Sequence, residues 1–578
     1  MKLKALFAAG VLALGACATG PAAPPPQPFF DIVIRGGDLY DGSGTAPVKA
    51  DVGISNDRIV FVGPRAPAPG RVEIDARGKA VAPGFINMLS WSTDSLMADG
   101  RGLSELKQGV TLQVMGEGDS MGPFTPAMQR NYEQRQGDIK FPVTWTTLDQ
   151  YLTGLEKRGV SMNVASFVGA TTIRINALGE GDVDPTAGQL ARMRALVVQA
   201  MEDGDMGVGS SLIYAPASYA ETDELAALVT EAGRCGGFYI SHMRSEGDRF
   251  IEAVDELIEI SRRSGAPAEI YHLKAAGRSN WPKLDQAIAR IEAARARGQR
   301  ITTDMYTYTA GATGLDAAMP VWVQAGGLEE WIKRLKDPAI RRRVIAEMRA
   351  EKSTFENLAR HAGPDGVVLL AFKNPALKPL TGKALAEVAR ARGVSPEDAA
   401  IDLVIEDGSR VGAAYFLMSE ENVARQTALP YMSFGSDAEG QAPEGVFKLS
   451  QPHPRAYGNF ARLLGKYVRE EKRLTLAEAV RKLTALPAHN LGLRERGRLV
   501  EGYFADVVVF DPATVGDRAT FPQPQQLAVG VSHVVVNGQL ALADGEPTAA
   551  RPGRVVRGRG WKGWPDGGCR KSAAEWNW

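Results

Sequence analysis

The stretches Tyr239-Ile240-Ser241-His242 and Glu269-Ile270-Tyr271-His272 decide the fold class, because each is a short β-prone run that ends in a histidine. The two histidines are 30 residues apart, the length of one strand–helix unit, and residues 250–263 between them have helical apolar spacing. Neighbouring parallel strands would bring both imidazoles to the same edge of a sheet. The sequence therefore predicts a parallel α/β fold with a functional site at the strand ends.

Six further β-prone runs surround this pair, and helical patterns such as residues 284–297 alternate with them. The predicted strands are 80–87, 110–116, 162–168, 206–212, 238–241, 268–271, 300–303 and 431–435. Eight strands with intervening helices predict a (β/α)8 barrel of the TIM type over residues 81–495. The interval before the last strand is too long for one crossover, so we expect an insertion at about 314–430 that forms a helical lid over the barrel mouth.

Short strands with Gly and Asp turns occur near both chain ends, in residues 29–80 and 496–560. Two such segments flanking the α/β region predict one small β-sandwich domain assembled from both ends. Residues 561–578 form a tryptophan-rich tail, for which packing on the protein surface is the simplest expectation.

The N-terminus has the composition of an export signal. Lys2 and Lys4 precede a short apolar run, and Leu14-Gly15-Ala16-Cys17 resembles a bacterial lipobox. Residues 1–17 are thus predicted to be a lipoprotein signal peptide, with Cys17 lipidated and the proline-rich residues 18–28 as a tether to the membrane. Ala18 favours the outer membrane of a Gram-negative cell, facing the periplasm; the alternative is an ordinary signal peptide with a chance cysteine.

The overall composition excludes some partners. Lys plus Arg and Asp plus Glu both number 67, so no global basic field favours nucleic acid. Two further cysteines, Cys235 and Cys569, could pair in a secreted chain, but a buried thiol is the expectation for Cys235. The sequence does not fix an oligomeric state.

His242, His272 and Asp437, which follows the strand 431–435, are all expected at one barrel mouth. Two imidazoles and a carboxylate can hold Zn²⁺ and leave a position open for water. The metal would polarise a scissile carbonyl, and a carboxylate could take the proton of the water. These residues therefore predict a metal-dependent hydrolase.

Six motifs follow one another along residues 29–560, and their order resembles that of the D-aminoacylases, the N-acyl-D-amino-acid deacylases of the amidohydrolase superfamily. The motifs are Pro83-Gly84-Phe85-Ile86, Ser241-His242-Met243-Arg244-Ser245-Glu246-Gly247, His272-Leu273-Lys274, Tyr306-Thr307-Tyr308-Thr309-Ala310-Gly311, Gly435-Ser436-Asp437 and Pro452-His453-Pro454-Arg455. The resemblance implies His242 and His272 as zinc ligands and Asp437 as general base. It also implies that Lys274, Tyr308 and Arg455 contact a substrate carboxylate, although the two cations could instead be solvated or structural.

Two departures from the family pattern reduce the expected metal site. The first strand of the family carries a His-x-His pair, but this chain has Leu89 and Trp91 in its place. Trp91 is expected to fill the corner of the site that the missing imidazoles would occupy, and to do so with apolar surface. Gly118 stands where the family has a metal-binding cysteine, and Glu117 beside it is a replacement ligand, unless it is a solvated or salt-bridged carboxylate. Glu117, His242 and His272 would make a site for about one zinc per chain, which resembles single-metal amidohydrolases with one Glu and two His.

The expected function is hydrolysis of a linear amide bond in N-acyl-D-amino acids or D-residue-containing peptides, with a carboxylate on the substrate. The same scaffold could hydrolyse another amide, an ester or a cyclic imide, because fold does not fix substrate. A metal-free periplasmic binding protein is the third possibility, but it would need no general base.

Overall fold

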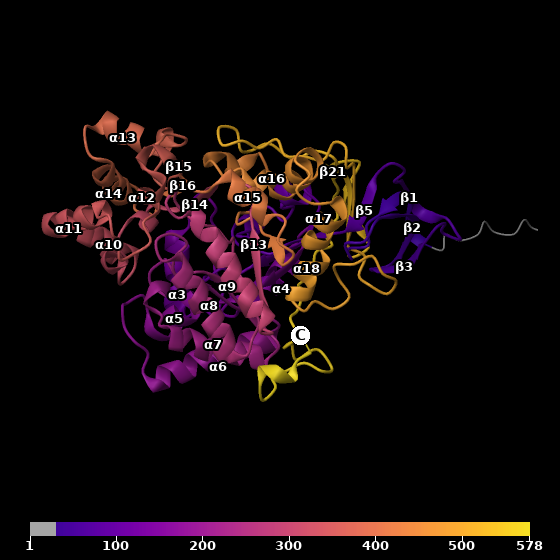
Figure 1. The fold of residues 1–578 in the computed structure, drawn as a ribbon, viewed down its shortest axis with the longest axis horizontal. Coiled ribbons are helices and arrows are strands. Elements are labelled where there is room, and N and C mark those ends of the chain that lie inside the picture. Colours follow the sequence, from indigo (N-terminus) through magenta and orange to yellow (C-terminus); the bar gives the residue numbers. More distant parts are fainter. Residues whose placement is uncertain (1–29, 578) are drawn as a thin grey trace, which may run out of the picture.

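The computed structural model describes residues 30–577, so the expectations for the signal peptide, Cys17 and the tether lie outside the described residues. The described chain is an α/β fold, drawn in Figure 1. None of the helices in residues 30–577 combines the length and apolar character needed to cross a bilayer.

Parallel strands form at all eight predicted places, and the third place, 162–168, is divided into two strands, β8 (Asn163–Ser166) and β9 (Val168–Gly169). The strands are β6 (Phe85–Asn87), β7 (Val110–Met115) and β8 in one sheet, and β9, β10 (Gly207–Ser211), β11 (Phe238–His242), β12 (Ala268–Ile270), β13 (Ile301–Met305) and β17 (Met432–Phe434) in another. Neighbours in chain order are paired throughout both sheets, up to the pairing of β13 with β17 across the long interval. The α/β class and the order of the strands are therefore as predicted.

The two parallel sheets approach one another at both ends. Strands β8 and β9 are separated along the chain by Phe167 alone. At the other end Met88 N donates to Phe434 O over 3.2 Å, and Ser90 forms a parallel bridge with Ala438. The segments after β6 and β17 consequently lie side by side, which brings residues 87–91 next to residues 436–438.

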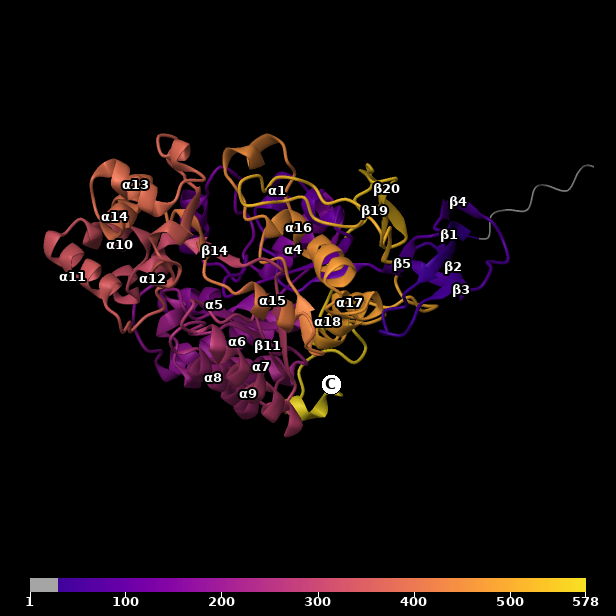
Figure 2. The ribbon, with the colours of Figure 1, turned by 45° about the horizontal axis from the view of Figure 1, so that its top comes forward.

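The helices between the strands pack their apolar faces against the sheets. The main ones are α4 (Leu148–Arg158), α5 (Ala170–Leu178), α6 (Ala187–Asp203), α7 (Thr222–Arg234), α8 (Phe250–Ser264) and α9 (Leu284–Ala296). Helix α8 buries Phe250, Val254 and Leu257 at helical spacing and ends at Gly265, whose φ of 70° suits glycine. Figure 2 shows α6 to α9 together on one side of the strands.

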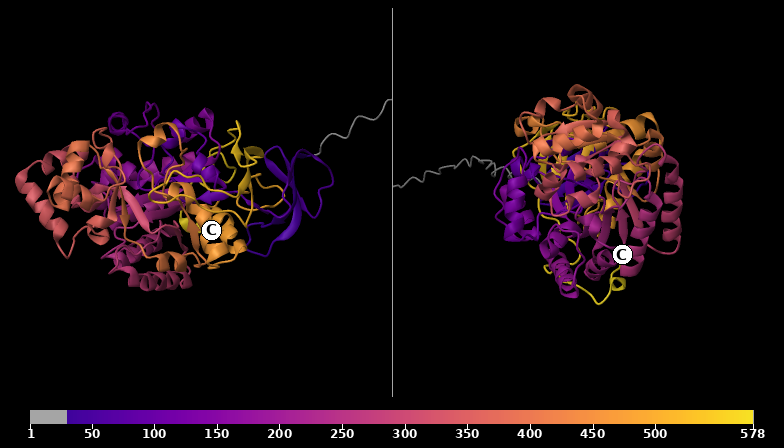
Figure 3. Two further views of the ribbon diagram at one scale, coloured as in Figure 1. Left: turned by 90° about the horizontal axis from the view of Figure 1, so that it is seen from above. Right: turned by 90° about the vertical axis from the view of Figure 1, so that its left-hand side faces the viewer.

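The long interval before β17 holds more than the expected helices. It contains α10 (Leu328–Leu335), α11 (Pro338–Arg349), α12 (Leu358–Ala362), α13 (Leu385–Arg392) and α14 (Pro396–Asp407). It also contains a three-stranded antiparallel sheet of β14 (Ala310–Gly314), β16 (Gly412–Phe416) and β15 (Val367–Ala371), in that order, which the sequence did not predict. These elements form one end of the molecule in Figures 1 and 3.

Both ends of the chain contribute to one nine-stranded sheet at the opposite end of the molecule. The N-terminal strands are β1 (Phe30–Leu39), β2 (Val48–Ser55), β3 (Arg58–Gly63), β4 (Gly70–Asp75) and β5 (Ala80–Pro83); the C-terminal strands are β18 (Val507–Phe510), β19 (Val531–Val536), β20 (Gln539–Ala543) and β21 (Glu546–Pro547). Strand β5 joins the two sets, because it pairs in parallel with β1 and antiparallel with β18.

The C-terminal tail is covalently attached to the rest of the fold. Cys235, directly after α7, forms a disulfide with Cys569, so the expected free thiol is wrong. The indole of Trp576 also donates to the carbonyl oxygen of Arg234 over 2.9 Å. The two cysteines are 334 residues apart in sequence, which is why no local pattern indicated that they pair.

Candidate active site

Glu117 stands in the turn after β7, where two glycines allow the chain to approach its neighbours closely. Gly116 has φ 102° and Gly118 has φ 75°. A Cβ at Gly116 would lie 2.2 Å from Phe167 O, and one at Gly118 would lie 2.4 Å from Ser211 Oγ. Only glycine fits both positions. The turn directs the Glu117 side chain into the fold, and the residue is only 4% exposed.

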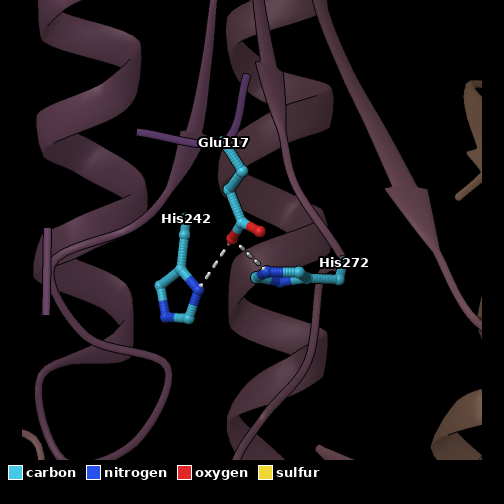
Figure 4. Close-up of side chains that lie close together, drawn as sticks. All are labelled: Glu117, His242 and His272. Carbon is cyan, nitrogen blue, oxygen red and sulfur yellow. Dashed lines mark hydrogen bonds and ion pairs between the residues drawn. The ribbon is translucent and has the colours of Figure 1, made fainter. Parts of the chain in front are cut away.

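A single carboxylate oxygen of Glu117 faces both imidazoles, as Figure 4 shows. Glu117 Oε1 lies 2.9 Å from His272 Nε2 and 3.2 Å from His242 Nδ1. One ligand atom from each of the three residues lies within 4.8 Å of the others, and all three residues are buried. His242 comes from the end of β11 and His272 from the turn after β12, as predicted.

These three groups fit a zinc ion. Imidazole nitrogen and carboxylate oxygen are zinc ligands, and bonds of about 2.0–2.1 Å put tetrahedral ligands about 3.3 Å apart, close to the 2.9 and 3.2 Å found here. Burial and Lys274 act to lower the pKa of His272, but Glu246 and Glu117 raise it overall to about 10. The carboxylates therefore favour positive charge at this point, whether a proton or a metal ion supplies it.

Glu246, which the sequence analysis did not single out, completes the surroundings of the imidazoles. Its Oε1 lies 3.0 Å from His272 Nδ1 and 2.6 Å from Lys274 Nζ. Burial alone would raise the pKa of Glu246, but Lys274 and the two imidazoles lower it overall. Its position four residues after His242, in the motif that begins at Ser241, was the available signal. Lys274 is consequently committed to an ion pair inside the site.

Asp304, near the end of β13, is bonded to the backbone of His272. Its Oδ1 accepts a hydrogen bond of 2.9 Å from the backbone N–H of His272. His272 has a φ of 33°, in the left-handed region that side chains other than glycine rarely adopt. Asp304 therefore holds His272 in an uncommon backbone conformation.

Asp437 lies in the same cavity, after β17, and its carboxylate has partners on both oxygens. Trp91 Nε1 lies 3.1 Å from Oδ1, and Arg455 Nη1 lies 2.8 Å from Oδ2. Its backbone N–H donates to Leu89 O over 2.9 Å, which fixes the turn against the segment after β6. Burial raises the pKa of Asp437, although Arg455 opposes the rise.

Trp91 does more than fill a corner with apolar surface, which corrects the sequence-based expectation. Its indole N–H is shared between Glu117 Oε2, at 2.9 Å, and Asp437 Oδ1, at 3.1 Å. Leu89, the other replacement on this strand segment, is fully buried. The corner therefore holds an uncharged hydrogen-bond donor that links two carboxylates.

Of the two tyrosines in the motif after β13, Tyr306 lines the cavity and Tyr308 does not, so the expected contact of Tyr308 is not supported. The Tyr308 hydroxyl donates to Asp517 Oδ2 over 2.9 Å, and its ring packs against the imidazole of His453. Tyr306 lies under the guanidinium of Arg455, at 4.4 Å from ring centroid to Cζ. Its buried hydroxyl has no hydrogen-bond partner among the described residues. The two tyrosines are two residues apart, and the sequence pattern did not distinguish them.

These groups meet in one cavity of about 610 Å³. Its lining includes Glu117, His242, His272, Lys274, Asp437 and Arg455, together with Trp91, Glu246 and Tyr306. The insertion adds Trp331, Leu358, Leu370 and Arg410 to the wall. Every predicted site residue in the described chain except Tyr308 therefore faces a common space.

Parallel strands that end in two imidazoles, with a buried carboxylate between them and a second nearby, fit the class of metal-dependent hydrolases. Comparison with known proteins identifies the family. The model of the amidohydrolase family matches residues 72–541, and the chain belongs to this family. It is an enzyme that hydrolyses carbon–nitrogen bonds.

Several relatives match almost end to end. The chain is 34% identical to an N-acyl-D-glutamate deacylase of Alcaligenes xylosoxydans xylosoxydans, over 92% of this chain and 97% of the relative. It is 33% identical to a D-aminoacylase of the same organism, over 92% and 98%. These relatives confirm the resemblance to the N-acyl-D-amino-acid deacylases.

Solved structures agree with this. The N-acyl-D-glutamate deacylase of Bordetella bronchiseptica, complexed with zinc and a phosphonate inhibitor, is 31% identical, with a TM-score of 0.75 over 91% of this chain and 99% of that one. A D-aminoacylase structure that concerns a binuclear metal centre is 32% identical, with a TM-score of 0.76 over 91% and 100%.

Proposed function

We propose that the protein hydrolyses the linear amide bond of N-acyl-D-amino acids or of peptides that contain a D-residue. The observation that carries this is the convergence of Glu117, His242 and His272 in one cavity with Asp437 and Arg455. The relatives named above are deacylases of N-acyl-D-glutamate and of D-amino acids, which supports the same reaction class here.

Glu117, His242 and His272 would hold a zinc ion. When bound, zinc polarises a carbonyl and lowers the pKa of water to about 7. Asp437 is the proposed general base: its carboxylate takes a proton from the attacking water and passes it to the amide nitrogen. The carbon–nitrogen bond then breaks, and the products are a carboxylic acid and the free amine of the D-amino acid.

We propose one zinc per chain, because Trp91 occupies the corner between Glu117 and Asp437. Its N–H engages Glu117 Oε2, the oxygen that faces away from the two imidazoles. An indole cannot bind a metal, and Leu89 offers no ligand atom. In D-aminoacylase, which has a binuclear centre, one metal activates and the second attenuates, so a single-metal enzyme is compatible with this chemistry.

Arg455 and Tyr306 are the proposed partners of the substrate carboxylate. The guanidinium lies over the Tyr306 ring, and the Tyr306 hydroxyl has no partner among the described residues. Lys274 contributes positive charge from the side of Glu246, to which it is bound. The planar guanidinium of Arg455 and the phenol of Tyr306 suit a carboxylate better than the ammonium of Lys274 alone, which is already bound to Glu246.

The cell envelope remains the proposed location, with the chain anchored through Cys17. The disulfide between Cys235 and Cys569 supports an oxidising compartment such as the periplasm. Attachment at the outer membrane rests on the sequence alone.

We further propose that the eight parallel strands form a (β/α)8 barrel. The bond from Met88 to Phe434 and the bridge from Ser90 to Ala438 support closure between the first and last strands. The sheet built from both chain ends would form a small β-sandwich of residues 29–80 and 496–560. The barrel would cover 81–495, with the insertion at about 314–430, and residues 561–578 would be the tail.

The experiment that tests the function is metal analysis of protein purified without chelator, together with release of free D-amino acid. We expect about one zinc per chain and metal-dependent deacylation. Glu117→Gln should lose the zinc, while Glu269→Gln, a matched control, should keep it. Glu269 is also fully buried, but it is bound to Thr302 and Asn490 and lies outside the cavity lining.

Two zinc ions per chain would contradict the role given to Trp91. No zinc, even after zinc is added, would contradict the hydrolytic mechanism and favour a metal-free binding protein. Zinc without D-amino acid release would indicate another amide, an ester or a cyclic imide as substrate.

A further inference from the structure

A second cavity, of about 360 Å³, adjoins the active-site cavity. The two cavities share five lining residues, which are Trp91, Asp119, Arg135, Ile175 and Glu180. The remaining wall comes from Thr93 and Asp94, from the segment after Asp119, from α3 (Pro126–Arg135) and the two residues after it, and from α5. Trp91, which bonds to Glu117 and Asp437, therefore has one cavity on either side.

The second cavity has a group of large apolar side chains in its wall, alongside polar ones. Met121 and Phe124 are buried residues that line it, and the rings of Phe124 and Tyr132 lie 5.8 Å apart. Helix α3 contributes Met128 and Tyr132, four residues apart and so on one helical face, and both are half-buried. Methionine adapts its shape readily, so this surface can accommodate flexible apolar groups.

The charged groups around the second cavity are already paired or lie where burial favours their neutral form. Arg135, the one cation in its lining, forms an ion pair with Glu180 at 2.9 Å. Burial raises the pKa of Asp94, which accepts a hydrogen bond from the Tyr132 hydroxyl. An anionic ligand would find no free cation in this lining, whereas an uncharged one would meet mostly hydrocarbon.

The second cavity is separate from the groups that are proposed to hold the substrate carboxylate. Arg455 and Tyr306, the proposed partners of the substrate carboxylate, and Lys274 beside them line only the first cavity. Trp91 stands at the boundary, in contact with Glu117 and the general base Asp437. In the proposed binding mode Arg455 holds the substrate carboxylate and the amide lies at Asp437. The acyl group, on the other side of the amide, would then extend past Trp91.

We propose that the second cavity binds the acyl chain of the substrate, and that this chain is a medium-length alkanoyl group rather than acetyl. The inference rests on the proposed deacylase function and specifies its substrate class. Burial of each methylene is worth about 0.8 kcal/mol, or about fourfold in binding. Chain extension should therefore raise kcat/KM until the cavity is full.

The test compares N-acetyl, N-butyryl and N-octanoyl derivatives of the same D-amino acids, with D-glutamate and D-leucine as two examples. We expect kcat/KM to rise by at least about 100-fold from acetyl to octanoyl. Met128→Trp should fill the cavity and abolish this advantage, while activity on the acetyl substrate is retained. Arg130→Trp is the matched control, because Arg130 is an exposed residue of the same helix that does not line the cavity.

A second measurement does not depend on turnover or on the variant's folding. Octanoate should bind the wild-type protein in calorimetry and compete with substrate, and acetate should bind far more weakly. A flat or falling dependence of kcat/KM on chain length, with no octanoate binding, would overturn the inference while deacylation itself stands. Absence of deacylation with every acyl group would instead reject the proposed function, and octanoate binding would still report on the cavity.

Discussion

Arg455 Nη1 lies 2.8 Å from Asp437 Oδ2, so the residue assigned to the substrate carboxylate also contacts the residue assigned to proton transfer. Arg455 is only 3% exposed, and this guanidinium is held over the ring of Tyr306. The contact places a bound substrate beside the base, because one cation touches both. It also limits the directions in which the Asp437 carboxylate can turn.

Replacing Asp437 with Asn should remove the proton acceptor without removing a proposed metal ligand. We expect kcat to fall by about 10²–10⁴-fold, because an amide cannot accept the proton of water. Zinc content should stay at the wild-type value, as measured by metal analysis of the same preparation. Retention of kcat within threefold or so would show that another group is the base.

The two tyrosines after β13 offer a matched pair of substitutions. Tyr306→Phe should raise KM about tenfold, the equivalent of one hydrogen bond to a charged group, and should leave the melting temperature nearly unchanged. Tyr308→Phe should lower the melting temperature, because Asp517 loses a donor at 2.9 Å, while KM is retained. Steady-state kinetics and thermal unfolding check both, and the reverse pattern would restore Tyr308 as the substrate contact.

Glu105 should make the protein less stable as the pH rises. It is fully buried, and burial raises its pKa to about 7 from 4.5, against hydrogen bonds from Ser436, Asn87 and Gln113. Between pH 4.5 and 7 the folded state therefore holds a proton that the unfolded state has lost. The free energy of unfolding falls over this interval, by on the order of 3 kcal/mol.

Glu105→Gln should reduce the slope of this decline. Urea unfolding at pH 5 and pH 8 measures it, and the wild-type protein should lose more stability between the two values than the variant. Some decline should remain in the variant, because burial also raises the pKa values of Glu269 and Glu439 to about 7. Equal slopes would mean that Glu105 is ionised in the folded protein at pH 5.

Cys569→Ser should release the C-terminal tail from α7. Loss of a native disulfide typically costs about 2–5 kcal/mol, and here we expect the loosening to concentrate in residues 561–577. Hydrogen exchange should increase around Trp576, which bonds to Arg234, while kcat/KM stays at the wild-type value. Reductant should have the same effect on the wild type and no effect on the variant; unchanged exchange in the variant would show that packing alone holds the tail.

The sequence was sufficient for the parts of this protein that depend on local patterns. The strand that ends at His242 and the strand that precedes Asp437 were recognised from β-prone runs, and Glu117 from the glycines beside it. Groups whose role depends on packing were missed or misjudged. The Trp91 indole N–H faces two carboxylates only because the segments after β6 and β17 meet. Glu246 contacts Lys274 only because the strands that precede them, β11 and β12, are neighbours in the sheet. The Cys235–Cys569 contact spans 334 residues, beyond the range of any periodicity.

The position of β5 between β1 and β18 has a consequence for how the chain reaches its folded state. Strand β5 is synthesised before the parallel strands, yet one of its two edges is covered by residues 507–510, which follow all of those strands in the chain. Pairing over such a separation carries a large loop-closure cost and slows folding. Until residues 507–510 emerge, this edge remains open to other strands. An exported chain would therefore need protection from aggregation through nearly its whole passage across the membrane.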